Sequence, residues 1–418
     1  MKRPNPVIQR LLERSPLILL PHPVAIGNAS EEIRFALLKA RRLRRKLLIL
    51  FPFPLLPKKI DLRGYEVKVF DMDSPHLLLR PFSVWLLPVR LLISLYFSTF
   101  RLLYLLFNRA LRIPVIKRDA ALAMRGQRHL WGPDSFTNQS RFLEVKNLCW
   151  PNQYSKRLDL QLSSKTLHLG QKKLEELKIS SNGWYACIHV REGGYYGDFN
   201  TASMRNLSIA NYIPLIEEIV ATGGRIFRMG DSSMTKLPNI PGLIDYAHSP
   251  WRSARMDAFL IANCSFYIGT QSGLLELAYL LSPPVLVTNM YGPYLGLPGT
   301  SRDQGKFQHF IDCQSGMEIQ PELLFGDNYA PGPHLDVQGV TYQELSPNEL
   351  VAALKSFMRD LQFFGGDGIP SGLSSRFIDA HQLWLDSVFS KDDCVSSSAA
   401  WFRFAARAPL PEPSFCEE

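Results

Sequence analysis

The chain has 418 residues, 46% of them hydrophobic and 20% charged, which excludes a disordered chain and indicates a globular protein with sizeable buried cores. This length allows two or three domains. The formal net charge of +9 at pH 7 favours anionic partners, such as a phosphorylated ligand, nucleic acid or an acidic membrane surface.

The chain contains six scattered cysteines and no Cys-x-x-Cys pair. In a chain of this length, the scatter favours free thiols in a reducing compartment. The first 14 residues carry several charges and the apolar run after them is very short, so this segment does not resemble a secretory signal. We therefore expect a cytoplasmic location.

The first part of the chain has a strand–turn–helix pattern, with Asn28 or Ser30 as the expected helix cap. The predicted elements are a strand at 17–20, a helix at 31–45, and strands at 46–51 and 67–70. This order is half of a βαβ unit and predicts a Rossmann-like domain over residues 1–170.

Asp71 and Asp73 directly follow the strand predicted at 67–70. Two carboxylates at this spacing could hold a divalent metal. Aspartate is equally common at strand ends as a turn or cap residue. The Asp-x-Asp pattern is therefore unspecific, and we assign no metal site.

The sequence predicts a long apolar and aromatic helix over residues 82–111. Arg90, Arg101 and Arg112 are spaced by eleven residues and share one face, and Ser94 falls close to that face. Such a helix could lie in a membrane interface with its arginines reaching the headgroups. It could also be a core helix that turns its polar stripe to water, or a membrane span. The basic run at 39–46 is either a solvated helix face or a patch for anionic lipid or nucleic acid.

From residue 171 to residue 365, short apolar strands alternate with helices, which predicts a second domain with a doubly wound parallel sheet. Strands are predicted at 184–190, 225–229, 243–246, 265–268 and 285–288, and a closing helix at 342–362. The turns after parallel strands lie at one edge of the sheet. Residues 366–418 are predicted to be a weakly ordered extension.

Two of these turns have the chemistry of an anion site. Arg191 and the glycines that follow it offer a planar fork of donors and a close backbone approach. His189 lies two residues earlier, on the same face of the strand. Residues 269–273, Gly-Thr-Gln-Ser-Gly, follow another strand and open a helix, where a phosphate is favoured. Together the two turns predict a diphosphate site. Taken alone, the first could be a core histidine beside a surface arginine, and the second could be an ordinary helix cap.

The order and spacing of the motifs between residues 184 and 289 resemble a group of glycosyltransferases from bacterial surface-polysaccharide gene clusters, itself distantly similar to fucosyltransferases that use GDP-fucose. The resemblance rests on Ile188–Glu192, Met204–Asn206, Asn211–Tyr212, Ile226–Gly230, Ile244–Tyr246, Arg252–Ser253, Met256–Asp257 and Gly269–Gly273, with a weaker match at Ser371–Leu385.

The resemblance implies a GT-B architecture, an α/β fold in which two Rossmann-like domains face each other across a cleft. The C-terminal domain is expected to bind a nucleotide sugar, linked to GDP or UDP, and the N-terminal domain to present a polysaccharide or lipid-linked acceptor. Arg191 takes the diphosphate contact. Electrostatic stabilisation of the leaving diphosphate needs no metal, so we expect no cofactor.

The candidate catalytic residues are Arg191, His189, Glu192 and Asp198, the last three as alternative general bases. The candidate substrate-binding residues are Arg205, Arg228, Gly230, Asp231, Thr270, Gln271, Ser272 and Gly273. Arg205 could instead be a surface charge, and Arg228 could pair with Asp231.

Two rival functions use the same sequence features. One is a sugar-nucleotide enzyme, such as an epimerase, that transfers nothing. The other is a catalytically silent protein that binds an anionic ligand or membrane. Nucleic acid is not an expected partner, because aromatic residues are not interleaved with the basic run.

Overall fold

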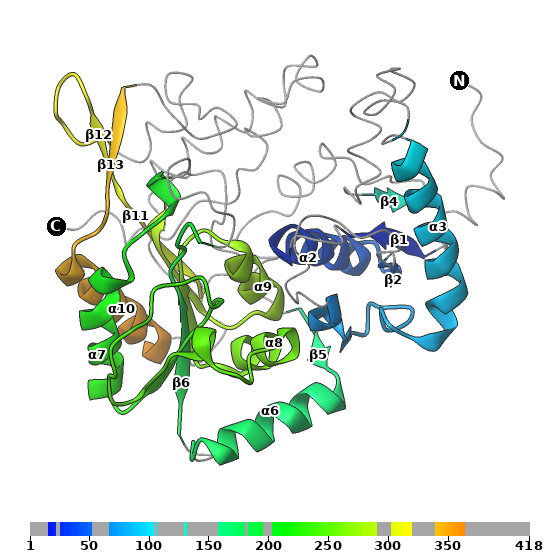
Figure 1. Ribbon diagram of the computed structural model, residues 1–418, viewed down its shortest axis with the longest axis horizontal. Helices are drawn as coiled ribbons and strands as arrows, with labels where there is room; N and C mark the ends of the chain where they lie inside the picture. The colour runs from blue at the N-terminus through cyan, green and yellow to red at the C-terminus, as the bar shows by residue number, and fades with distance from the viewer. Residues whose placement is uncertain are drawn as a thin grey trace. The chain divides into compact units, whose positions relative to one another are not determined.

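The computed structural model describes residues 16–21, 26–51, 67–103, 106, 129–131, 158–179, 183–194, 203–290, 302–319 and 339–363 (Figure 1). The chain divides into two compact units. The first comprises residues 1–141, 158–170 and 253–259, and the second comprises residues 142–157, 171–252 and 260–418. The extension predicted at 366–418 lies outside the described residues.

The first unit contains a strand–helix–strand unit followed by an antiparallel strand. The parallel strands β1 (Leu17–Leu20) and β2 (Leu47–Ile49) are joined by helix α2 (Ile26–Arg42), and β4 (His129–Trp131) pairs antiparallel with β1. Because α2 begins at Ile26, both Asn28 and Ser30 lie inside the helix, and the prediction that one of them caps it is wrong. Ser30 is fully buried, so packing of α2 on the sheet decides where the helix begins rather than local capping.

The prediction of a strand at 67–70 is wrong, because Val67–Phe70 forms a 3₁₀ turn. Val69 and Phe70 are both buried, and Phe70 stacks on Phe51 with ring centroids 5.4 Å apart. A strand would send these two neighbours to opposite faces, whereas a helical turn buries both on one side. The strand is instead β3 (Met72–Asp73), which pairs with β5 (Gln161–Leu162).

Asp73 makes the contacts expected of a turn residue. Its Oδ1 accepts a hydrogen bond from Ser74 N at 2.9 Å, and its Oδ2 pairs with Arg80 Nε at 2.9 Å. Within the described residues, no group of three or more His, Cys, Asp or Glu side chains could hold a metal ion.

The predicted apolar helix is present as α3 (Leu87–Leu103) and begins later than residue 82, while residues 104, 105 and 107–111 lie outside the described residues. Both predictions for its polar stripe are wrong at Arg90 and Ser94, which turn neither to headgroups nor to water, because both side chains are buried. Among the described helices, none has the length and apolar character to cross a bilayer. Arg112 and the side chain of Arg101 lie outside the described residues.

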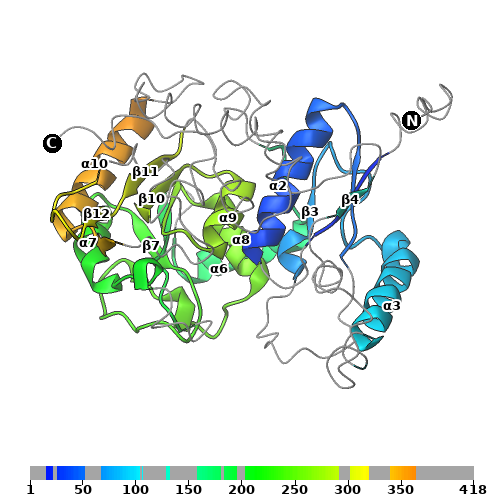
Figure 2. The same cartoon turned by 90° about the horizontal axis from the view of Figure 1, so that it is seen from above.

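The second unit is built on a six-stranded parallel sheet, which confirms the parallel α/β prediction (Figures 1 and 2). In sheet order the strands are β11 (Gln304–Phe307), β10 (Val285–Met290), β9 (Phe266–Gly269), β6 (Tyr185–His189), β7 (Arg225–Arg228) and β8 (Leu243–Ile244). All five pairings are parallel. The chain starts at the central strand β6, moves out through β7 and β8, and returns to β9 on the other side of β6. The strand order therefore reverses between β6 and β9.

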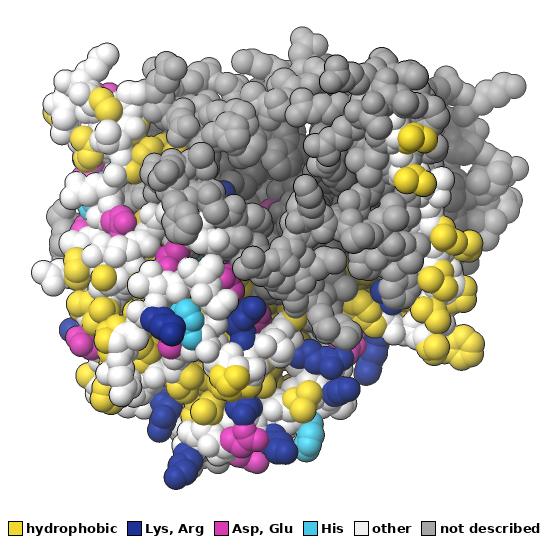
Figure 3. Space-filling model, viewed as in Figure 1, with side chains coloured by type: hydrophobic (Ala, Val, Ile, Leu, Met, Phe, Trp, Pro, Cys, Tyr) yellow, Lys and Arg dark blue, Asp and Glu magenta, His cyan; other side chains and the backbone are white. Residues whose placement is uncertain are grey.

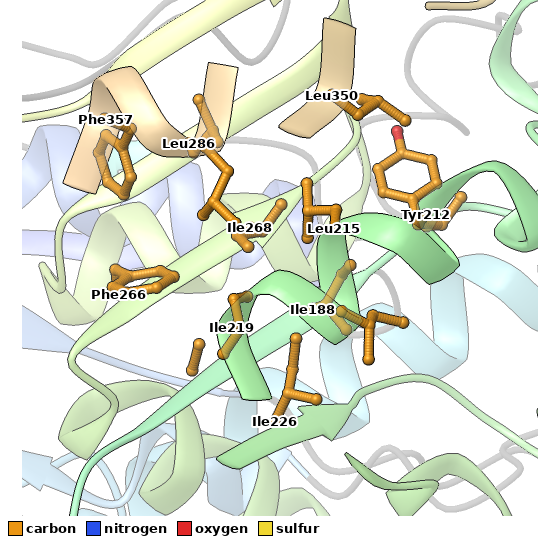
Figure 4. Packing of buried hydrophobic residues seen from close by; sticks show 14 of the residues in the cluster. Ile188, Tyr212, Leu215, Ile219, Ile226, Phe266, Ile268, Leu286, Leu350 and Phe357 are labelled. Atoms are coloured by element: carbon orange, nitrogen blue, oxygen red, sulfur yellow. The ribbon is translucent and has the colours of Figure 1, made fainter. Parts of the chain in front are cut away.

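The main core of this unit lies between the sheet and two helices, α7 (Ile213–Ala221) and α10 (Pro347–Phe363) (Figure 4). Ile188, Ile226 and Ile268 point from three strands toward Leu215 and Ile219, which lie one helical turn apart on α7. Each fully buried aliphatic side chain contributes about 1.5–3 kcal/mol to folding. This core holds the carboxyl edge of the sheet in place.

Helix α9 (Gly273–Leu281) and residues 260–263 of α8 (Ala254–Asn263), the part of that helix that belongs to this unit, complete the alternation of strands and helices here. Figure 2 shows α9 on the side of the sheet away from α7 and α10. The carbonyl of Leu260 in α8 accepts a hydrogen bond from the Tyr185 hydroxyl of β6 at 3.2 Å. Covering helices on both faces explain why the strands are almost continuously apolar.

The closing helix begins later than predicted. Residues 340–343 form strand β13 (Val340–Gln343), paired antiparallel with β12 (His309–Asp312), and α10 begins at Pro347. Ser346 N donates to Glu349 Oε2 at 2.8 Å, and Glu349 N donates to Ser346 Oγ at 3.3 Å. This reciprocal capping box, with proline as the first helical residue, explains the start of α10.

Candidate functional site at the carboxyl edge of the sheet

The two predicted anion-binding turns follow β6 and β9, which are neighbours in the sheet. His189 and Gly269 are register partners at the ends of these strands. Thr270 N donates to the His189 carbonyl at 3.1 Å, and Arg191 N donates to Thr270 Oγ1 at 2.9 Å. These bonds hold the two turns together, so the sequence correctly predicted that they would meet at one edge.

His189 connects the same turns through its side chain. Its Nδ1 lies 3.1 Å from Ser272 Oγ, and this oxygen also accepts a hydrogen bond from Leu275 N at 3.4 Å. Burial, together with the nearby charges of Arg228 and Arg191, lowers the pKa of His189 to about 3. The ring is therefore neutral at pH 7. We assign the Ser272 hydroxyl as the hydrogen-bond donor and His189 Nδ1 as the acceptor, so the ring proton of His189 is on Nε2.

Ser272 is the N-cap of α9. Its extended backbone and its bond to Leu275 N define the beginning of this nine-residue helix. The helix N-terminus carries partial positive charge and points backbone N–H groups outward, so it favours a phosphate. Thr270 and Gln271 are buried immediately before it.

Arg191 is held from its backbone and from its side chain. Its carbonyl accepts a hydrogen bond from Leu207 N at 3.0 Å, and its Nη1 donates to Asn206 Oδ1. The arginine is only 7% exposed. A guanidinium with restricted motion loses little entropy when it binds an anion, which suits a preorganised diphosphate contact.

A buried arginine supports Glu192 from the neighbouring strand. Arg228 is fully buried, and its Nη2 lies 3.1 Å from Glu192 Oε1 while its Nη1 lies 3.3 Å from Asp245 Oδ1. The other oxygen of Glu192 accepts a hydrogen bond from Thr235 N at 2.6 Å. From the sequence, Asp231 was a possible partner of Arg228. In the structure, Asp231 Oδ1 accepts a hydrogen bond from Ser233 N at 2.8 Å.

Gly230 allows the turn after β7. Its φ of +136° is unfavourable for other residues, and an added Cβ would lie 2.1 Å from Met234 Sδ. Its carbonyl accepts a hydrogen bond from Arg252 Nη1 at 3.3 Å.

For three predicted site residues, the structure gives a position in the chain or none at all, rather than a role in the site. Arg205 ends the 3₁₀ turn Ser203–Arg205 and is half-buried, and Gly273 is the first residue of α9. Asp198 lies outside the described residues. No contact described here tests the roles of these residues, so those roles stay predictions.

Sequence reasoning missed three supporting residues, Asn206, Thr235 and Asp245. Asn206 and Asp245 were within motifs that carried the family resemblance, but their side-chain roles were not predicted. Their partners lie 15 and 17 residues away in the chain, and Thr235 contributes only a backbone N–H over 43 residues. No short motif signals such pairings.

No family model matches the chain, and the search of curated proteins gave no significant match. Among solved structures, Escherichia coli ADP-heptose lps heptosyltransferase II is 14% identical and has a TM-score of 0.41, with 82% of this chain and 99% of that chain covered. NodZ α-1,6-fucosyltransferase, soaked with GDP-fucose, is also 14% identical and has a TM-score of 0.27, with 64% of this chain and 93% of that chain covered. Both similarities are low, and we transfer no residue role from either protein.

Proposed function

We propose that this chain is a glycosyltransferase that moves a sugar from a GDP- or UDP-linked donor to a glycan or lipid-linked acceptor. One observation carries the proposal. The turns with Arg191 and Thr270 follow β6 and β9, the two strands between which the sheet order reverses. In open parallel sheets, ligands bind in the crevice outside the carboxyl ends of the strands at this switch point.

The chemistry of the two turns fits a leaving diphosphate. Breaking the bond between the sugar and the nucleotide leaves growing negative charge on the phosphate oxygens. Arg191 supplies a fixed positive charge, and the Ser272-capped start of α9 supplies backbone N–H groups and a helix dipole. In this proposal no metal is needed for that step. His189 acts by positioning Ser272, which its Nδ1 contacts.

We propose that the general base is one of the three predicted candidates, with Glu192 and Asp198 favoured over His189, because the His189 Nδ1 already contacts Ser272 and burial lowers the His189 pKa to about 3. It must accept the proton of the acceptor hydroxyl. His189 and Glu192 already make hydrogen bonds within the sheet edge. The variants His189→Asn, Glu192→Gln and Asp198→Asn separate the candidates, since loss of the base lowers kcat by about 10²–10⁴-fold. Nucleotide affinity should be unchanged in the variant that lacks only the base.

The proposal extends to the whole chain. The first unit is proposed to present the acceptor and the second to bind the donor, in a GT-B arrangement. The reaction is proposed to take place in the cytoplasm.

A nucleotide screen followed by a turnover assay tests the proposal. We expect GDP or UDP, but not CMP, to raise the melting temperature in the presence of EDTA, because a ligand of the folded state stabilises it. The matching sugar nucleotide should then release its nucleoside diphosphate. An altered sugar without nucleotide release would favour the epimerase reading. No nucleotide shift and no turnover would favour a silent binding protein and contradict the proposal.

A further inference from the structure

Two polar side chains of helix α3, those of Arg90 and Ser94, lie on the side that faces the protein. Arg90 Nε donates to the Phe51 carbonyl at 2.8 Å, and the guanidinium lies 5.0 Å from the centre of the Phe82 ring. Ser94 Oγ donates to the Arg90 carbonyl within the helix. Both polar side chains are buried, at 7% and 1% exposure.

The side of α3 that faces away from the protein is mostly apolar, and Thr99 is an exposed polar residue of the helix. Figure 3 shows hydrophobic side chains gathered along this helix. The exposed apolar residues of the helix and of the turn before it, here called the outer face, are Val84, Trp85, Leu87, Val89, Leu91, Leu92, Leu95, Tyr96 and Leu102. Trp85 is 79% exposed, Leu92 67% and Leu95 56%.

This arrangement is the reverse of an ordinary surface helix, which turns its apolar stripe inward and its polar residues to water. Single exposed leucines are common in soluble proteins, but a contiguous apolar patch marks a place where a membrane or another protein binds. The outer face therefore needs an apolar environment.

The charge distribution identifies that environment. Residues 1–141 contain 25 Lys and Arg but only 9 Asp and Glu, whereas residues 142–418 contain 22 and 29. No acidic residue occurs between Asp73 and Asp119, a segment that includes α3 and seven basic residues. A second copy would bring two like-charged segments together, which costs free energy, whereas an anionic lipid surface attracts them.

We infer that α3 anchors the protein to an anionic bilayer by lying in the interface, with the outer face against the acyl chains. Its 17 residues extend about 25 Å at 1.5 Å per residue, enough for a long contact in the membrane plane. Trp85 and Tyr96 suit the headgroup boundary, because their rings combine an apolar body with a polar group. This inference does not depend on the proposed nucleotide site.

Flotation of the full chain with vesicles tests the inference. We expect strong binding to vesicles of phosphatidylcholine mixed with phosphatidylglycerol, weaker binding to phosphatidylcholine alone, and release at high salt. The double variant Leu92→Gln/Leu95→Gln should bind anionic vesicles at least tenfold more weakly. The matched control Leu169→Gln/Met317→Gln also changes two exposed apolar side chains, both outside α3, and should bind like the wild type.

Several results would overturn the inference. One is a wild-type protein that does not float with anionic vesicles, and another is equal binding by the α3 variant and the control. A solution dimer that becomes monomeric in Leu92→Gln/Leu95→Gln would show that a second copy covers the outer face. Unchanged melting of the α3 variant in solution distinguishes loss of membrane contact from loss of fold.

Discussion

At the scale of single residues, burial of a neutral histidine makes stability depend on pH. The folded-state pKa of His189 is about 3, below its ordinary value, so the unfolded chain binds a proton that the folded protein excludes. Stability from this group is present above the unfolded pKa and falls as pH falls toward 3. Between pH 7.5 and pH 5, this linkage costs about 2 kcal/mol.

Urea denaturation of the wild type and of His189→Asn at pH 7.5 and pH 5 measures the loss of unfolding free energy on acidification, and the difference between the two proteins is the part due to His189. The variant should lose less stability than the wild type on acidification. His309 provides an internal contrast. Burial opposes its charge, but hydrogen bonds and charges from Glu318 and Glu349 outweigh burial and raise its pKa. The stability that His309 contributes is present below its unfolded pKa and is lost as pH rises through its folded pKa. On acidification, His309→Asn should therefore lose more stability than the wild type, whereas His189→Asn should lose less.

Arg228 is a second residue whose loss should be costly. Arg228→Met leaves the Glu192 and Asp245 carboxylates without their buried counter-charge, which should cost about 3–5 kcal/mol of unfolding free energy. Adding Glu192→Gln should restore part of the loss. Arg225, at the exposed amino end of the same strand, is the matched control, and Arg225→Met should change stability by less than about 0.5 kcal/mol. Equal losses in the two single variants would contradict the ion-pair account.

At the scale of secondary-structure elements, the start of α10 depends on its capping box. Ser346→Ala removes the oxygen that accepts the Glu349 N–H and should destabilise the protein by about 1 kcal/mol. Ser356→Ala, inside the same helix, should be neutral or slightly stabilising, because alanine is the better helix former. Chemical denaturation of both variants compares them, and a loss no larger in Ser346→Ala would exclude a capping role.

The sequence predicted most elements of the second unit, because short apolar strands with glycine turns are a clear signal. It failed where packing overrides local preference, as at Ser30 in α2 and at Val69 and Phe70 in a 3₁₀ turn. In α3, periodicity correctly placed Arg90 and Ser94 near one face. Periodicity cannot show which face meets the protein, and that orientation depends on the Phe51 carbonyl and the Phe82 ring.

At the scale of the whole molecule, the rules for parallel sheets made the site predictable. Because carboxyl ends share one edge, turns some 80 residues apart in the chain could be expected to meet, and Arg191 N donates to Thr270 Oγ1 as a result. The supporting contacts of Asn206 and Asp245 were not predictable, since they depend on the course of the connecting turns. The excess of basic charge in residues 1–141 and of acidic charge in the remainder is visible in the sequence alone.

The most direct test of a diphosphate site at the switch point is calorimetric titration of Arg191→Ala and Arg225→Ala with GDP and UDP in EDTA. Arg191 lies at the carboxyl edge beside Thr270, whereas Arg225 is exposed at the amino end of β7. Loss of a charge-assisted hydrogen bond worth about 1.5–3 kcal/mol should weaken binding about 10–100-fold in Arg191→Ala. Arg225→Ala should bind like the wild type. Equal affinity in Arg191→Ala and the wild type, or equal weakening in the two variants, would contradict the site.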